Sequence, residues 1–318
     1  MAPLPSKDVV ILDGGMSREL IRLQAPFRQP EWSALALLEA PHLVRQAHAD
    51  FAAAGARVLT TNSYALVPFH IGLERFQARG EQLAALAGRL ARETADSCAE
   101  GEAGRGEGKS VRVAGSLPPI FGSYEPELYD AALVQERLAV LVKGLGPYVD
   151  VWLGETLSLV AEAEAVRVAT RESGKPVWIA FTLDDGVAGA EQAPARLRSG
   201  ESVREAAQWA VGAGVEALLF NCSQPEFMDA AIKDARHVFE QEAAASGARA
   251  PLIGVYANAF EPKAGDEAAN EAISDTRAEL TPELYLEFAR RWVEIGATIV
   301  GGCCGIGCDH IRKVADHV

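Results

Sequence analysis

The sequence has too little positive charge for an anionic partner. Lysine and arginine together number 30 against 44 acidic residues, which gives a formal net charge of -14 over 318 residues. A nucleic-acid backbone or an anionic membrane would repel such a surface. We therefore expect small-molecule partners, with no nucleic acid and no membrane. The sequence does not indicate an oligomeric state.

Long apolar runs and a leader segment are also missing. No stretch approaches the roughly 20 apolar residues that a membrane-spanning helix needs. The segment Met1 to Asp8 has no basic region followed by an apolar run, as a secretory leader would have. The five cysteines have no regular framework spacing, which fits a reducing compartment. We expect a cytoplasmic protein.

Two common catalytic patterns are absent as well. The Gly14-Gly15 pair lacks the third glycine and the later acidic residue of a dinucleotide fingerprint, which argues against a nicotinamide cofactor. None of the six histidines stands beside a cysteine or serine in a nucleophile-and-base arrangement. For each of them, including His48 and His70, we expect a satisfied or solvated side chain.

Short apolar runs alternate with longer segments of helical periodicity along the whole chain. The predicted strands are 9–12, 57–61, 111–115, 149–153, 177–182, 216–220, 252–255 and 298–300. The predicted helices are 34–54, 81–98, 131–145, 159–173, 202–211, 226–245, 282–295 and 309–317. Strands that read as continuous apolar runs are typical of parallel sheets covered on both faces. We predict one α/β domain over residues 1–318, a (β/α)8 barrel.

A polar residue follows nearly every predicted strand. These residues are Asp13, Asn62, Ser116, Glu155, Thr182, Asn221-Cys222, Asn258 and Cys303-Cys304. In barrel enzymes the catalytic groups lie at the carboxyl ends of the strands. Two long polar segments, 183–201 and 259–279, follow strands on the same side and could cover a substrate.

The run Gly301-Gly302-Cys303-Cys304-Gly305 is the most informative motif. With Cys222 it offers three sulfurs from the sixth and eighth strands. Gly302 and Gly305 can adopt backbone angles that would turn both neighbouring sulfurs inward. Three thiolates favour zinc and leave a fourth position open. A disulfide, a redox pair and simple burial remain alternatives. We expect Cys308 to be a spare thiol and Cys98 to be structural.

The sequence resembles the homocysteine S-methyltransferase family over nearly its whole length. The similar motifs are Asp13-Gly14-Gly15-Met16, Thr61-Asn62-Ser63-Tyr64, Gly115-Ser116, Glu155-Thr156, Asn221-Cys222-Ser223, Tyr256-Ala257-Asn258 and the double-cysteine run with His310-Ile311.

This resemblance implies that zinc, held by Cys222, Cys303 and Cys304, activates homocysteine for methyl transfer to give methionine. It implies that Asp13, the backbone of Gly14 and Glu155 bind the amino-acid end of homocysteine. No catalytic residue is implied beyond the zinc-activated substrate thiolate. The compact length favours a sulfonium donor, S-methylmethionine or S-adenosylmethionine.

Departures from the family pattern surround the site without removing a ligand. Ile306 and Cys308 replace a usual Thr and Pro, Leu117-Pro118-Pro119 replaces Ile-Gly-Pro, and Ser17-Arg18 replaces Gly-Thr. Two alternatives therefore stay open. One is a related barrel that uses another thiol or an onium donor such as betaine. The other is a zinc-holding or redox-sensing protein without turnover.

Overall fold

The computed structural model describes residues 9–100, 110–186, 193–247, 249–260 and 276–318. All eight predicted strands are present, as β1 (Val10–Ile11), β2 (Val58–Thr60), β3 (Arg112–Leu117), β4 (Val151–Leu157), β5 (Val177–Phe181), β6 (Ala217–Asn221), β7 (Leu252–Tyr256) and β8 (Ile299–Val300). They form one parallel sheet in which each strand pairs with its neighbours in chain order, and β1 pairs with β8. A parallel bridge from Leu12 to Val58 closes the gap between β1 and β2. The predicted (β/α)8 barrel is confirmed.

Two layers of apolar side chains hold the barrel together. The interior layer consists of Leu12, Val58, Ala114, Val151, Leu153, Trp178, Ala180, Ala217, Leu219, Tyr256 and Ile299. The strand residues between them, such as Trp152, Ile179 and Leu218, belong to the larger core between the sheet and the helices. Successive side chains of a strand point to opposite faces, and here both faces are buried. This explains why the strands read as unbroken apolar runs.

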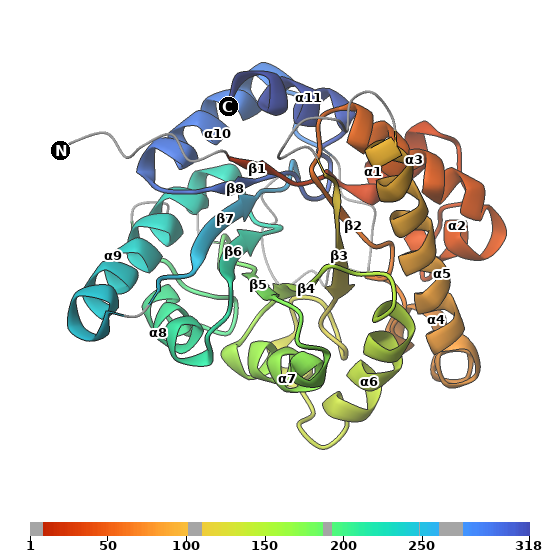
Figure 1. The fold of residues 1–318 in the computed structure, drawn as a ribbon, viewed down its shortest axis with the longest axis horizontal. Helices are drawn as coiled ribbons and strands as arrows, with labels where there is room; N and C mark the ends of the chain where they lie inside the picture. Colours follow the sequence, from red (N-terminus) through yellow and green to blue (C-terminus); the bar gives the residue numbers. More distant parts are fainter. Residues whose placement is uncertain (1–8, 101–109, 187–192, 248, 261–275) are drawn as a thin grey trace.

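Helices form a ring around the strands (Figure 1). They are α1 (Met16–Arg22), α2 (Ser33–Glu39), α3 (Pro41–Ala53), α4 (Pro68–Ile71), α5 (Leu73–Glu100), α6 (Val134–Leu145), α7 (Val160–Thr170), α8 (Val203–Ala213), α9 (Met228–Ser246), α10 (Pro282–Ile295) and α11 (Cys308–His317). Short 3-10 turns lie at Pro126–Leu128, Arg171–Ser173 and Pro225–Phe227.

The predicted helices differ from the structure mainly at their ends. The helix expected over 34–54 is two helices, because Pro41 lacks an N–H and so starts α3. The short helices α1 and α4 were not predicted, since neither is long enough to show a clear period. The bounds of α10 match the prediction.

The strands β3, β4, β6 and β7 run further toward the carboxyl rim than predicted, and β3 and β4 do so by more than one residue. Ser116 lies inside β3 and Glu155 inside β4, so neither simply follows its strand. Within the described residues, no helix is both long and apolar enough to span a membrane. Parts of the polar segments 183–201 and 259–279 lie outside the described residues. A single domain over 1–318 stays a prediction.

Candidate metal centre

Three cysteine sulfurs converge at the carboxyl rim of the barrel. Those of Cys222, which directly follows β6, and of Cys303 and Cys304, which follow β8, all lie within 4.8 Å of one another. The sulfurs of Cys222 and Cys304 are 3.7 Å apart. Tetrahedral zinc with Zn–S bonds of about 2.3 Å places its sulfur ligands about 3.8 Å apart. The three side chains therefore fit the donor set and the spacing of a zinc site with one position open.

The turn after β8 depends on two glycines for different reasons. Gly305 has a φ of +81°, which favours glycine, as the sequence predicted. Gly302 does not have a positive φ, so that part of the prediction is wrong. A Cβ at Gly302 would lie 2.2 Å from Ile306 Cγ2, and it is this close packing that excludes a side chain. The buried Ile306 thus shapes the turn that carries Cys303 and Cys304.

Cys222 reaches the cluster through an unusual backbone conformation. Its φ is +51°, in the left-handed region that few non-glycine residues adopt. Its N–H donates to the carbonyl of Tyr256, which ends β7, at 3.2 Å. Strained backbone of this kind persists where its surroundings hold it in place, and it is common at functional sites. No sequence signal pointed to this conformation.

The Asp13-Gly14-Gly15 segment packs against the double-cysteine turn. The N–H of Gly15 donates to the carbonyl of Ile306 at 2.8 Å, and the N–H of Gly302 donates to the carbonyl of Asp13 at 3.0 Å. A Cβ at Gly15 would lie 2.5 Å from the carbonyl oxygen of Cys303, and one at Gly14 would lie 2.5 Å from that of Ile306. The paired glycines therefore let the first and last strands support the same double-cysteine turn.

The three thiols differ in acidity because they hydrogen-bond to one another. Hydrogen bonds from Cys303 and Cys304 lower the pKa of Cys222 well below its usual range. The interactions with Cys222 raise the pKa of both Cys303 and Cys304. The cluster thus favours a thiolate on Cys222. Cys308 begins α11 and is not one of the converging sulfurs; burial raises the pKa of its thiol.

Two buried carboxyl groups lie beside the sulfurs in the same pocket. Asp13 accepts hydrogen bonds from the N–H of Thr60 at 2.7 Å and from its hydroxyl at 2.9 Å. Glu155 accepts hydrogen bonds from the hydroxyl of Ser116 and, at 3.2 Å, from that of Tyr256. Burial raises the pKa of both carboxyl groups to about 7 despite these hydrogen bonds. Near neutral pH, a bound cation would stabilise their ionised forms.

A β-bulge aims Glu155 at the pocket. Gly154 pairs with Ile179 and Leu157 with Phe181, so Glu155 and Thr156 together face the single residue Ala180. Bulges of this type redirect a side chain, and they often occur next to active sites. The bulge explains how a residue within a strand can point toward the cysteine cluster.

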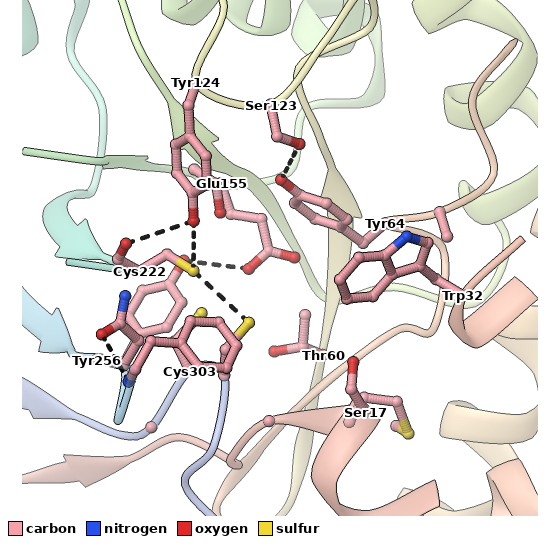
Figure 2. Close-up of a pocket in the computed structure, with 18 of the residues that line it drawn as sticks. Ser17, Trp32, Thr60, Tyr64, Ser123, Tyr124, Glu155, Cys222, Tyr256 and Cys303 are labelled. Atoms are coloured by element: carbon pink, nitrogen blue, oxygen red, sulfur yellow. Dashed lines mark hydrogen bonds between the residues drawn. The ribbon is translucent and has the colours of Figure 1, made fainter. Parts of the chain in front are cut away.

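The pocket has a volume of about 720 Å³, in the range that ordinary ligand sites occupy. The carboxyl groups, the three cysteines and Gly14 all line it. Figure 2 shows Tyr124 above Cys222, and Trp32 and Tyr64 on the other side of the pocket. The hydroxyl of Tyr64 bonds that of Ser123 at 2.7 Å.

Several lining residues were not identified as functional from the sequence. They are Trp32, Tyr124, Asp185 and Arg198. All four lie in loops, where no periodic pattern marks them. Asp184, Asp185 and Arg198 belong to the described part of the predicted 183–201 loop, so that loop does reach the pocket.

The expectation of a satisfied or solvated histidine fails at His48. Its ring is completely buried in α3, and neither nitrogen has a hydrogen-bond partner among the described residues. Burial lowers its pKa to about 4. His70 fits the expectation, because its Nδ1 lies 2.9 Å from the carbonyl of Pro30.

Comparison with known proteins places the chain in a family. The family model described as homocysteine S-methyltransferase matches residues 10–318. Homocysteine S-methyltransferase 4 of Zea mays is 28% identical, with 96% of this chain and 88% of the relative aligned. A selenocysteine methyltransferase of Astragalus bisulcatus is 27% identical, over 96% of this chain and 90% of the relative.

Solved structures agree with this result. The metallated form of the homocysteine methyltransferase MmuM from Escherichia coli superposes with a TM-score of 0.75 at 25% identity. The match covers 98% of this chain and 97% of that one. The fold, the converging cysteines and the match over nearly the entire length agree with the resemblance seen in the sequence motifs. The chain belongs to the homocysteine S-methyltransferase family of methyl-transferring enzymes.

Proposed function

We propose that the protein transfers a methyl group from a sulfonium donor to the sulfur of homocysteine held at a zinc ion. Cys222, Cys303 and Cys304 hold the metal in this proposal. The observation that carries it is the convergence of these three sulfurs within 4.8 Å in a pocket that also contains two buried carboxyl groups. Zinc, when bound, supplies an acceptor sulfur in thiolate form near neutral pH.

Asp13 and Glu155 bind the ammonium group of homocysteine in this proposal, and Gly14 contributes backbone contact. Their raised pKa values of about 7 fit this role, because an incoming ammonium ion stabilises the carboxylate form. Thr60, Ser116 and Tyr256 orient the two carboxyl groups through the hydrogen bonds they donate. The substrate is thereby fixed at two ends, its sulfur at the cysteines and its amino group at the carboxylates.

Aromatic side chains support a cationic donor. The rings of Trp32 and Tyr64 line the pocket across from Cys222, and ring faces attract cations (Figure 2). S-methylmethionine and S-adenosylmethionine both present a sulfonium methyl group. When the thiolate attacks the methyl carbon, a new carbon–sulfur bond forms. The donor's carbon–sulfur bond breaks, and its electron pair stays on the leaving thioether.

The test combines metal content with product formation. We expect about one zinc per chain in the parent protein and in Cys308→Ser, with methionine formed from homocysteine by both. Cys222→Ser should lose metal and activity together. Zinc retained at the parent level in Cys222→Ser, or full activity of a metal-free protein, would contradict the proposal. Unchanged behaviour of Cys308→Ser also argues against a redox switch that uses this thiol.

Donor and acceptor are identified by two screens. With homocysteine fixed, S-methylmethionine, S-adenosylmethionine and betaine are compared by kcat/KM; we expect one of the sulfonium compounds to exceed betaine. With the best donor fixed, homocysteine is compared with selenocysteine, which is named as the acceptor of one relative. Activity with betaine alone would contradict the sulfonium assignment.

A further inference from the structure

Tyr124 makes a direct contact with one of the three converging cysteines. Its hydroxyl donates a hydrogen bond to Cys222 Sγ at 3.0 Å (Figure 2). Tyr124 lies in the connection between β3 and α6 and has a φ of +68°, a conformation that non-glycine residues rarely adopt. The backbone here is held in a costly conformation, and the side chain it presents points at a sulfur.

The ring of Tyr124 is held in place from its other side. The guanidinium carbon of Arg198 lies 4.3 Å from the centre of the ring. Arg198 is itself fixed by hydrogen bonds to Asp185 at 2.6 Å and to the hydroxyl of Thr182 at 3.2 Å. The second oxygen of Asp185 accepts from the N–H of Gln224 at 2.9 Å. One carboxylate therefore ties the segment after Cys222 to the arginine that supports the tyrosine.

The proposed metal centre must direct the methyl donor to the substrate sulfur and not to its own cysteines. A substrate thiolate would stand among three protein thiolates, and each of these sulfurs could attack a methyl donor. Attack by Cys222 would form a carbon–sulfur bond to the protein and release the donor as its thioether. The cysteine would then be blocked. A hydrogen bond draws electron density from a thiolate lone pair and makes that sulfur a weaker nucleophile.

We propose that Tyr124 is a positioning residue that directs alkylation away from Cys222 and toward the substrate sulfur. This inference rests on the proposed metal centre and adds to it a protective role for one phenol. Apart from its hydrogen bonds with the other two thiols, Cys303 has a longer contact, 3.9 Å from the side-chain amide nitrogen of Asn221. Among the hydrogen bonds of the described residues to these three sulfurs, that of Tyr124 is the one donated by a hydroxyl group.

The test uses Tyr124→Phe with Tyr129→Phe as a matched control. Both variants remove one phenolic oxygen, but the hydroxyl of Tyr129 donates to the carbonyl of Ala161 at 3.3 Å and the residue does not line the pocket. Zinc-loaded protein is treated with iodoacetamide, and modified Cys222 is quantified by peptide mass spectrometry. In this reaction the cysteine sulfur bonds to the reagent's carbon and iodide leaves. We expect about 10-fold faster modification in Tyr124→Phe and the parent rate in Tyr129→Phe.

A second readout needs no reaction. In cobalt-loaded protein the thiolate-to-cobalt absorption band should move to longer wavelength in Tyr124→Phe, because the sulfur lone pair loses its hydrogen bond. Arg198→Ala keeps the hydroxyl but frees the ring. It should give a modification rate between those of the parent and Tyr124→Phe. If Tyr124→Phe fails to fold, the modification rate of Cys222 in Arg198→Ala alone tests the role of Tyr124.

The outcomes separate the two proposals. Equal modification rates and equal cobalt bands in the parent, Tyr124→Phe and Arg198→Ala would overturn the role of Tyr124 and leave the metal centre standing. A parent protein that binds neither zinc nor cobalt would overturn both.

Discussion

Asn221 and Thr156 form a reciprocal pair of hydrogen bonds between β6 and β4. The N–H of Thr156 donates to Asn221 Oδ1 at 3.0 Å, and Asn221 Nδ2 donates to the Thr156 hydroxyl at 2.8 Å. Both side chains are buried. Glu155 precedes Thr156, and Cys222 follows Asn221. The pair therefore fixes the separation between Glu155, which we propose binds the substrate, and Cys222, which we propose binds the metal.

Asn221→Ala should damage both halves of the site. It leaves the Thr156 N–H unpaired in the interior, which costs about 1–3 kcal/mol in the free energy of unfolding. We also expect about 10-fold weaker zinc binding, measured by competition with a chelator, and a raised KM for homocysteine. Thr156→Ser keeps both hydrogen bonds and serves as the control. A loss of stability with unchanged zinc affinity and KM would show that the pair is only structural.

Gly15→Ala should displace the double-cysteine turn. The added Cβ would lie 2.5 Å from the carbonyl oxygen of Cys303. This backbone atom cannot move aside without also moving the side chain of Cys303. We expect a loss of about 1–3 kcal/mol in stability, with weaker metal binding. Gly212→Ala in α8 is the control, because a Cβ there meets nothing within 4 Å and alanine favours the helix. Parent-like metal affinity in Gly15→Ala would disprove the proposed support of the turn.

Homocysteine affinity should fall as the pH drops through about 7. The pKa values of Asp13 and Glu155 are raised to about 7, so both become neutral below this pH and lose their attraction for an ammonium group. Glu155→Gln should bind homocysteine more weakly, with a flatter pH profile. Calorimetry with homocysteine and with 4-mercaptobutyrate, which lacks the amino group, isolates the effect. The same pH profile for both ligands would refute it.

His48 should make the fold sensitive to acid. Its pKa is lowered to about 4 by burial, against 6.5 in the unfolded chain, so the unfolded state takes up the proton first as the pH falls. Stability is then fully present above pH 6.5 and is lost toward pH 4, by about 3 kcal/mol for this residue.

His48→Leu should flatten this part of the curve of unfolding free energy against pH. His70 also has a pKa lowered to about 4 by burial, so part of the slope should remain. Urea denaturation at pH 7 and at pH 5 measures the difference. A parent-like slope in His48→Leu would mean that the ring is hydrated or partnered in solution.

The amino-acid pattern alone predicts the barrel and the rim at which its reactive groups lie. Eight continuous apolar runs separated by helical periods permit few other folds, because parallel strands need both faces covered. The cysteine motifs indicate the family, and the strand order predicts that Cys222, Cys303 and Cys304 lie at one rim. The end of an apolar run does not mark the end of a strand, so the pattern predicts Ser116 and Glu155 after strands that in fact contain them.

The way in which those groups face one another follows from contacts that form in the folded chain. The bulge at Glu155-Thr156, the left-handed conformation of Cys222 and the packing of Ile306 on Gly302 all depend on contacts with other strands. The same holds for Tyr124, whose hydrogen bond to Cys222 spans 98 positions of sequence. Local periodicity reports which face of an element is buried. Backbone strain and contacts between loops arise from the folded whole, so no single stretch of sequence records them.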